Sequence, residues 1–270
     1  MLHKISKAFK AATHIVRNPW LLNYVLDSSE VRKKYIIKKY NMPAGFPVIY
    51  SEDLFDDFNV TIEPFSFLEG GSLPTDHALL KKLASLTSHC KYFEIGTWRG
   101  ESVANVASVA EQCYTLNLSA KEMEQQGLSQ EYINLHRFFS SGLPKVTHLE
   151  GNSKTYDFAS LNQKFDLIFI DGDHHYESVK SDTMKVFKHL VHEQSVVVWH
   201  DYGYNPEVPR FDVMAGILDG CPEQFRDKIY HFAHSMSAIF INKPIKGRKL
   251  TAPVRPDRYY KVDIKEIKIK

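Results

Sequence analysis

The fold prediction starts from one stretch, Glu94-Ile95-Gly96-Thr97-Trp98-Arg99-Gly100-Glu101-Ser102. It follows a short apolar strand expected at 92–96 and leads into a helix expected at 100–111. Gly96 permits a tight exit from the strand, and Gly100 opens the helix without a Cβ in the way. In doubly wound α/β sheets, ligands bind beyond the carboxyl ends of the strands, so this loop is the first candidate binding site.

The surrounding sequence alternates short apolar strands with helices. Strands are expected at 92–96, 113–118, 146–150, 167–171 and 195–199, and further helices at 129–140, 175–191 and 209–219. This alternation predicts a parallel sheet covered on both faces. The last two strands, 228–233 and 237–242, are too close in sequence for a helical crossover and should form an antiparallel hairpin at the sheet edge.

Three segments are predicted. Residues 1–72 form a basic helical N-terminal extension and connector, 73–244 form the α/β domain, and 245–270 form a basic C-terminal tail. Residues 5–40 look helical with a break at Asn18-Pro19, and Ser72 or Thr75 can cap a helix that contains Leu79 and Leu80.

Charge is distributed unevenly along the chain. Residues 1–40 hold nine Lys/Arg and residues 243–270 hold ten, whereas the middle holds 15 basic and 27 acidic residues. The two basic arms either pack on or beside the acidic core or make a weak contact with an anionic membrane or polymer. An acidic core argues against a nucleic-acid partner.

The apolar runs and the cysteines of the sequence indicate the cellular compartment in which the protein is expected. No apolar run approaches the roughly 20 residues of a membrane span, and the N-terminus lacks the apolar run of a signal peptide. Cys90, Cys113 and Cys221 are widely spaced and are expected to be reduced, mostly buried thiols. A cytoplasmic protein is therefore expected, and a homodimer is compatible with the sequence.

The loop also discriminates between cofactors. A dinucleotide-binding loop needs a further glycine between Gly96 and Gly100, because its backbone approaches a pyrophosphate. Trp98 occupies that position. A bulky residue there fits S-adenosylmethionine (SAM), which has no pyrophosphate, better than NAD. Glu94, at the strand end, can accept a hydrogen bond from the amino group of the methionine part of SAM.

Three motifs together resemble a known family. Glu94 through Gly100 resembles motif I of class I SAM-dependent methyltransferases, and Phe165-Asp166-Leu167-Ile168-Phe169-Ile170-Asp171-Gly172-Asp173-His174-His175-Tyr176 resembles motif IV of a bacterial small-molecule branch. Trp199-His200-Asp201-Tyr202 resembles the end of the fifth strand of that branch. The resemblance implies a Rossmann-like doubly wound sheet of five parallel strands plus the hairpin, in the order 3-2-1-4-5-7-6.

The resemblance also implies which residues bind SAM. They are Glu94, Gly96, Thr97, Trp98, Gly100, Ser102, Asn117, Asn152, Ser153 and Asp171. Two of them depart from the family pattern. Asn117 stands where the family has an acid that binds the ribose hydroxyls. Asn152 replaces the Asp of the Gly-Asp-Ser sequence that the family often has near the adenine. Each loss of a charge-assisted bond should weaken SAM binding by about 1–2 kcal/mol.

The acceptor chemistry is expected after the fourth and fifth strands. Methyl transfer mainly requires an acceptor that is positioned and deprotonated. In one mechanism, Asp171, His200 and Asp201 bind a divalent cation that lowers the pKa of an acceptor hydroxyl. Mg²⁺ or Mn²⁺ is the natural choice, and a histidine ligand favours Mn²⁺, Fe²⁺ or Zn²⁺ over Mg²⁺. In the other mechanism, His174 or His200 is the general base.

Less specific interpretations remain open. Asp173 can cap the helix that begins near Tyr176, and His175 can be a surface residue. The leading function is methylation of a small-molecule hydroxyl, on a sugar or a secondary metabolite. The alternatives are a non-catalytic or degenerate SAM- or nucleotide-binding protein and an NAD(P)-dependent oxidoreductase.

Overall fold

A central mixed sheet organises the chain in this computed structural model, which describes residues 2–22, 26 and 28–269. Within those residues, eight strands form the sheet in the order β1-β9-β10-β6-β5-β2-β3-β4, and β7 and β8 form a small second sheet. The strands are β1 (Val48–Ile49), β2 (Lys91–Ile95), β3 (Gln112–Asn117), β4 (Val146–Glu150), β5 (Leu167–Ile170), β6 (Val196–Trp199), β7 (Gly203–Asn205), β8 (Val208–Pro209), β9 (Ile229–Phe232) and β10 (Ala238–Ile241).

The other elements are α-helices and short 3-10 helices, most of which connect these strands. They are α1 (Leu2–Arg17), η1 (Pro19–Leu21), α3 (Ser29–Tyr40), η2 (Ser51–Asp53), α4 (Pro74–Ser85), α5 (Glu101–Ala107), α6 (Ala120–Gln125), α7 (Gln130–Leu135), η3 (Phe158–Leu161), α8 (Tyr176–His189), α9 (Phe211–Gly220) and η4 (Glu223–Lys228). None of the described helices is both long and apolar enough to span a bilayer.

The predicted Rossmann-like α/β class is confirmed. Strands β4, β3, β2, β5 and β6 run parallel, and β10 pairs antiparallel with both β6 and β9. One expectation about the hairpin is wrong, because β9 is not the edge strand. The short strand β1 pairs in parallel with β9 and covers it. β1 belongs to the Pro- and Gly-rich connector, where two residues are too few to show a strand periodicity.

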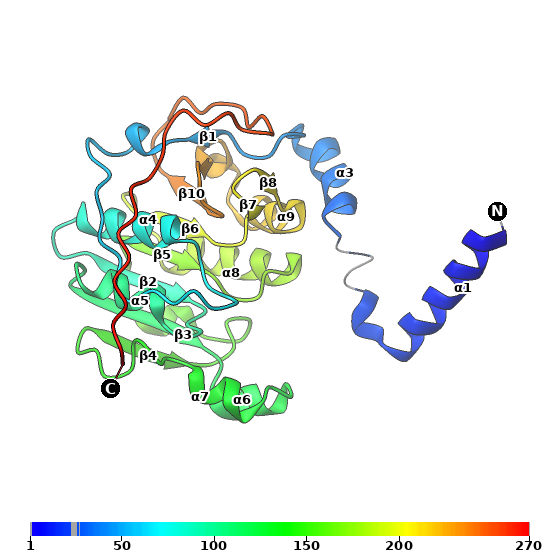
Figure 1. Cartoon of the computed structure of the whole chain (residues 1–270), viewed down its shortest axis with the longest axis horizontal. Coiled ribbons are helices and arrows are strands. Elements are labelled where there is room, and N and C mark those ends of the chain that lie inside the picture. The colour runs from blue at the N-terminus through cyan, green and yellow to red at the C-terminus, as the bar shows by residue number, and fades with distance from the viewer. Residues whose placement is uncertain (1, 23–25, 27, 270) are drawn as a thin grey trace.

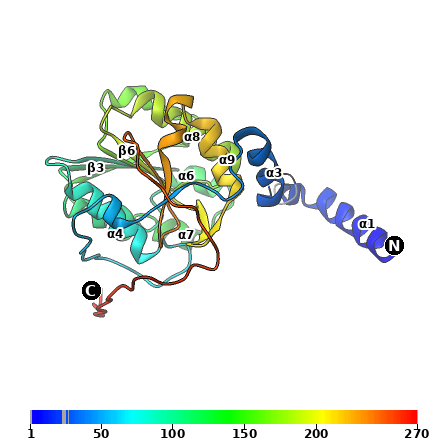
Figure 2. The same ribbon diagram turned by 90° about the horizontal axis from the view of Figure 1, so that it is seen from above.

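Side chains that alternate along the strands fill two cores. On one face, Phe93 and Ile168 pack with residues of α8, α9 and α3. On the other face, Tyr92 and Leu167 pack with residues of α4 and α5. Figure 2 shows α4 on one side of the sheet and α8 and α9 on the other. The near-continuous apolar strands thus reflect burial on both faces.

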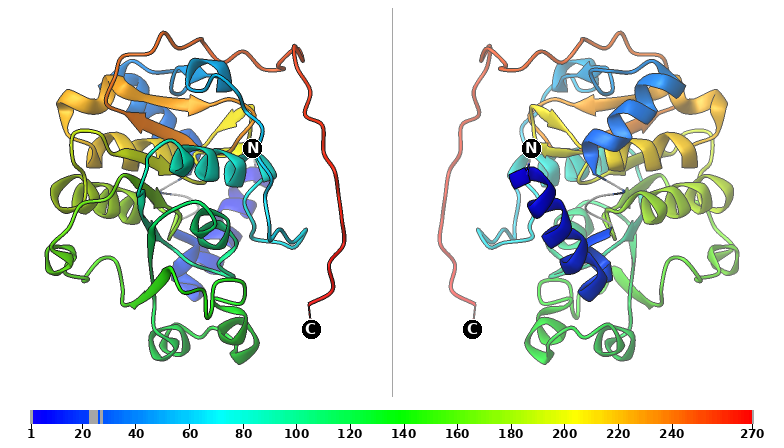
Figure 3. Two further views of the ribbon diagram at one scale, coloured as in Figure 1. Left: turned by 90° about the vertical axis from the view of Figure 1, so that its left-hand side faces the viewer. Right: turned by 90° about the vertical axis from the view of Figure 1, so that its right-hand side faces the viewer.

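The two basic arms behave differently. The C-terminal arm is tied to the connector, because Val48 and Arg248 exchange backbone hydrogen bonds of 2.7 Å and Arg258 pairs with Glu52. Figure 3 shows the rest of this arm running along the outside of the domain. In the N-terminal arm, α3 packs on α9, but α1 projects away from the domain (Figure 1). Packing of the whole N-terminal arm on the core, one of the two explanations above, is therefore wrong for α1.

Candidate active site

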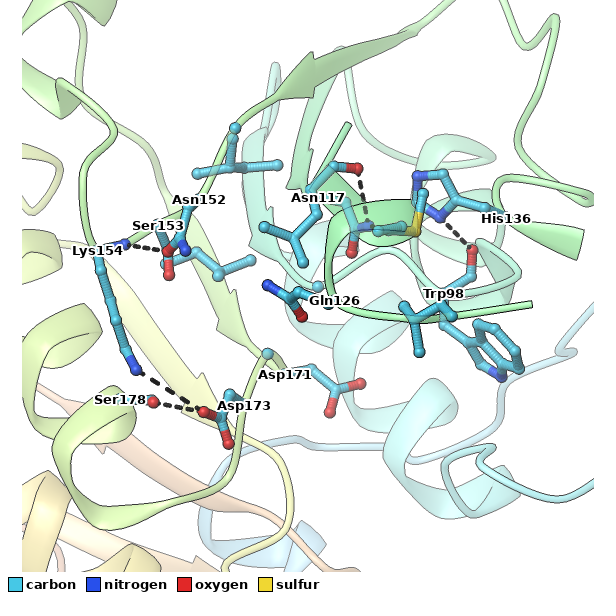
Figure 4. A pocket seen from close by; sticks show the side chains of 18 of the residues that line it. Trp98, Asn117, Gln126, His136, Asn152, Ser153, Lys154, Asp171, Asp173 and Ser178 are labelled. Carbon is cyan, nitrogen blue, oxygen red and sulfur yellow. Dashed lines mark hydrogen bonds and ion pairs between the residues drawn. The ribbon is translucent and has the colours of Figure 1, made fainter. Parts of the chain in front are cut away.

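A cavity of about 370 Å³ opens at the carboxyl ends of β2, β3, β4 and β5. Six of the ten predicted SAM-binding residues line it: Gly96, Trp98, Asn117, Asn152, Ser153 and Asp171. In Figure 4, Trp98 and His136 lie on one side of the cavity and Ser153 and Lys154 on the other, with Asp171 between them. The sequence motif and the cavity therefore coincide at the end of the sheet where α/β proteins bind ligands.

Backbone geometry explains the glycine at the exit of β2. Gly96 has a φ of +93°, and a Cβ at this residue would lie 2.0 Å from the carbonyl oxygen of Asp171. The loop therefore lies directly against the end of β5. A Gly96→Val variant would disrupt this contact between two backbone segments, so it would damage the fold as well as the binding loop.

Four predicted binding residues do not line the cavity: Glu94, Thr97, Gly100 and Ser102. Glu94 is fully buried, and its carboxyl group accepts hydrogen bonds from Tyr92, Ser102 and Thr115, with oxygen–oxygen distances of 2.7–2.8 Å. The structure thus corrects the expected contact between Glu94 and the methionine part of SAM, because hydroxyl groups of the protein surround this carboxyl group. Burial raises the pKa of Glu94 to about 7 even though these hydroxyl groups lower it.

The raised pKa of Glu94 predicts a dependence of stability on pH. The folded protein holds this proton more tightly than the unfolded chain, whose pKa is near the ordinary value of 4.5. The stabilisation is complete below pH 4.5 and is lost as the pH rises to about 7. The substitution Glu94→Gln removes this loss of stability at higher pH, because a glutamine side chain does not titrate. Urea unfolding should show the variant more stable than the wild type at pH 8, by up to about 3 kcal/mol, with a smaller difference at about pH 5.

A control on an exposed acid isolates this effect. Glu124 in α6 is exposed, so Glu124→Gln should leave the pH dependence of unfolding as in the wild type. If Glu94→Gln shows the same pH dependence as the wild type, the raised pKa of the Glu94 carboxyl group is wrong.

Asn117 and Asn152 are placed for different roles. The side-chain oxygen of Asn117, at the end of β3, accepts a hydrogen bond from the backbone N–H of Thr97 at 3.3 Å. Asn117 therefore links β3 to the loop that follows β2, and it lines the cavity. The side-chain oxygen of Asn152 accepts from the backbone N–H of Lys154 at 2.9 Å and shapes the turn after β4.

A further wall of the cavity was not predicted from the sequence. The ring of Tyr132, in α7, stacks on the ring of Trp98 with centroids 4.0 Å apart. The backbone oxygen of Trp98 accepts a hydrogen bond from the backbone N–H of Arg137 at 2.8 Å. These contacts hold Trp98 at a φ of +42°, an uncommon conformation for a bulky residue that is typical of functional sites.

An acid–imidazole cluster adjoins the cavity. His200 Nδ1 lies 3.0 Å from Asp171 Oδ1 and 3.6 Å from Asp201 Oδ2. Burial opposes a charge on His200, but Asp171 and the other carboxylates raise the pKa of His200 well above its ordinary value. Contacts with His200 outweigh burial and lower the pKa of Asp201 to about 2. The cluster therefore favours a bound cation, whether a proton or a metal ion.

Asp76, in α4, is a third carboxylate at this cluster and was not predicted from the sequence. It is fully buried, and Oδ2 lies 3.8 Å from His200 Nε2. Its oxygens also accept hydrogen bonds from the Ser237 hydroxyl at 2.6 Å and from the Leu73 backbone N–H at 2.9 Å. Because these contacts fix the Asp76 carboxylate, it can orient the ring of His200 from behind.

The remaining predicted residues lie around the cluster. His174 Nδ1 is 3.7 Å from Asp201 Oδ2, but the His174 side chain is about half exposed. Asp173 accepts from the backbone N–H of His175 at 3.1 Å and from the Ser178 hydroxyl at 2.6 Å. These bonds fit the interpretation of Asp173 as a residue that supports the start of α8.

The donor set fits a divalent metal ion. One ligand atom each from Asp171, His200 and Asp201 lies within 4.8 Å of the other two, and they form the one group of this kind found among the described residues. Asp201 has a φ of +55°, so the backbone turns sharply to present this carboxylate. His200 Nε2 is buried and lacks a hydrogen bond in the described chain, while Nδ1 faces the two carboxylates. Two carboxylates and one imidazole suit Mn²⁺, Fe²⁺ or Zn²⁺, and Mg²⁺ with additional water ligands.

A comparison with known protein families finds a match to part of the chain. Residues 93–202 match a family described as a methyltransferase domain. No match was found among curated proteins. The matched residues include the binding loop, the strand ends around the cavity, and the residues Asp171, His200 and Asp201.

Several solved structures are similar at low identity. An O-methyltransferase from Bacillus cereus in complex with SAH is 16% identical, with 64% of this chain and 84% of that chain covered and a TM-score of 0.45. The O-methyltransferase TomG from Streptomyces achromogenes, involved in tomaymycin synthesis and in complex with SAM, is 16% identical, with coverages of 63% and 80% and a TM-score of 0.39. A spermidine synthase from Thermotoga maritima is 17% identical, with coverages of 62% and 59% and a TM-score of 0.40.

Proposed function

We propose that this chain is a class I SAM-dependent methyltransferase and that it transfers the methyl group of SAM to a hydroxyl group of a small molecule. The supporting observation is the position of Asp171. This residue lines the cavity proposed for SAM and also belongs to the acid–imidazole cluster with His200 and Asp201. A cofactor in the cavity and an acceptor at the cluster would therefore be neighbours.

The reaction requires an acceptor oxygen that can attack the methyl carbon. The bond between the sulfonium sulfur and the methyl carbon breaks as a bond from the acceptor oxygen to that carbon forms. The sulfur keeps the electron pair and becomes the thioether of S-adenosylhomocysteine, and the hydroxyl proton leaves to a base. The protein's task is to hold the two reactants in line and to assist the loss of that proton.

For the second task, we favour assistance by a metal ion. Asp171, Asp201 and His200 Nδ1 would hold a divalent cation, with Mn²⁺ as the first choice and Mg²⁺, Fe²⁺ and Zn²⁺ as alternatives. Such an ion lowers the pKa of a bound hydroxyl group. His200 would then be neutral, with its proton on Nε2. This atom lies 3.8 Å from Asp76 Oδ2, which is longer than the hydrogen bond from histidine to carboxylate that is common in metal sites. The competing mechanism uses His200 or His174 as the general base.

Binding of SAM is the first test of the proposal. SAM should raise the melting temperature in proportion to the logarithm of its concentration, with a stabilisation of about 2.7 kcal/mol at a hundredfold excess over Kd, and NAD should have no effect. Calorimetry then gives the affinity. Asn117→Asp should tighten SAM binding by about fivefold to thirtyfold, since a carboxylate can accept charge-assisted bonds from the ribose hydroxyls.

The possible outcomes separate the alternatives. Stabilisation by NAD and not by SAM would favour the oxidoreductase, and SAM binding without transfer to any acceptor would favour the non-catalytic protein. If Asn117→Asp leaves SAM affinity unchanged or weakens it, Asn117 does not contact the ribose.

A further inference from the structure

Helix α1 is amphipathic, and its apolar side chains are uncovered. The helix projects away from the domain (Figures 1 and 2), and Ile5, Phe9 and Val16 are 61%, 76% and 79% exposed. Together with Ala12 they recur at intervals of four, three and four residues, which places them in one stripe along the helix. A soluble domain normally buries such a stripe. We therefore expect this face of α1 to bind a partner or a surface.

The opposite face of α1 is cationic. Lys7, Lys10, His14 and Arg17 recur at intervals of three, four and three residues, and Lys4 lies at the flank. The chain contains no acidic residue before Asp27. Helix α1 therefore has an apolar stripe and a net positive charge, and it contains no acidic side chain to neutralise that charge.

This charge decides between two occupants of the apolar stripe. Two α1 helices packed through their apolar stripes would leave both basic faces in water, and no acidic side chain of α1 could form an ion pair across the contact. An anionic surface with an apolar layer beneath it matches both faces of the helix. A bilayer that contains anionic lipid has this structure, with negative headgroups above acyl chains.

We propose that α1 binds the surface of membranes that contain anionic phospholipid. The helix lies in the plane of the interface, Ile5, Phe9 and Val16 insert between the headgroups, and the lysines face the phosphates. Residues 18–28 connect it to α3, which is held on the domain by the contacts of Tyr35, Lys39 and Tyr40 with Asp219. The domain would then remain close to the membrane while its cavity stays in water. This binding does not depend on methyl transfer.

Vesicle flotation of the full-length protein tests the proposal. The protein should float with phosphatidylcholine vesicles that contain phosphatidylglycerol, should bind phosphatidylcholine alone at least about tenfold more weakly, and should dissociate as salt is added. Phe9→Gln should weaken binding by about tenfold or more, because a polar group replaces an inserted ring. Ala11→Gln, which adds the same group outside the apolar stripe, should bind nearly as the wild type does.

Other outcomes overturn the proposal. No binding by the wild type, or equal binding by Phe9→Gln and the wild type, contradicts insertion of the apolar stripe. If the wild type sediments as a dimer that Phe9→Gln dissociates, a second copy is the occupant. SAM affinity serves as the control for folding and should be the same in all variants, because α1 does not line the cavity.

Discussion

Asp171→Ala and Asp201→Ala are each expected to lower the rate of methyl transfer by about a thousandfold or more, while SAM affinity stays within about threefold of the wild type. Both carboxylates face His200, and removal of either leaves too few ligands for a metal ion and an unbalanced charge on His200. Asp171 lines the cavity proposed for SAM, but Asp171 Oδ1 lies 3.0 Å from His200 Nδ1, so we assign this carboxylate to the cluster. Transfer is measured as formation of S-adenosylhomocysteine with an acceptor that the wild type methylates.

The nearby acid Glu177 provides a matched control. It is exposed on α8 and belongs to neither the cluster nor the cavity, so Glu177→Ala should retain wild-type transfer and SAM affinity. Full activity in both the Asp171 and Asp201 variants would remove this cluster from the mechanism. Loss of SAM binding in the Asp171 variant would instead mean that this carboxylate helps to bind the cofactor.

Local sequence patterns could predict the parts of the site that lie next to strand ends. Gly96 and Asp171 each follow an apolar strand and Asn117 ends one, and parallel strands bring their carboxyl ends to one edge of the sheet. The same reasoning failed for Glu94, which lies two residues before Gly96 and still within β2. At that depth its carboxyl group is surrounded by the hydroxyl groups of Tyr92, Ser102 and Thr115 and does not reach the edge of the sheet.

Contacts between distant segments could not be predicted in this way. Asp76 lies in the first turn of α4 and accepts a bond from the Leu73 backbone, so in sequence it resembles an ordinary capping residue. Its approach to His200 depends on how α4 packs across the sheet. The stack of Tyr132 on Trp98 likewise depends on where α7 lies relative to the binding loop, which no periodicity encodes.

The arms show the limit of charge as a predictor. Both arms are basic, but α3 packs on α9 through the buried Ile36 and the contacts with Asp219, whereas α1 has no such contacts within the described residues. The difference lies in the order of apolar and charged residues, and net charge does not report it. A stripe of exposed apolar side chains distinguishes α1 from the helix that follows it.

Removal of divalent metal ions is expected to abolish methyl transfer in the wild type, again by about a thousandfold or more, without loss of SAM binding. The dialysed protein, shown by elemental analysis to be free of metal, should regain activity with Mn²⁺. Mn²⁺ binding can be followed without any acceptor, by electron paramagnetic resonance of the free ion. It should be lost in Asp171→Ala and Asp201→Ala and retained in Glu177→Ala, because a site of three ligands does not survive the loss of one carboxylate.

The same experiment decides between the two mechanisms for removing the hydroxyl proton. A metal ion requires a neutral His200, whereas the neighbouring carboxylates hold a proton on this imidazole and raise its pKa. Binding of Mn²⁺ should therefore release a proton, which calorimetry in buffers of different ionisation enthalpy detects. Full activity in the metal-free protein would contradict the metal mechanism and leave His200 or His174 as the general base. In that case His200→Gln and His174→Gln would identify which imidazole accepts the proton.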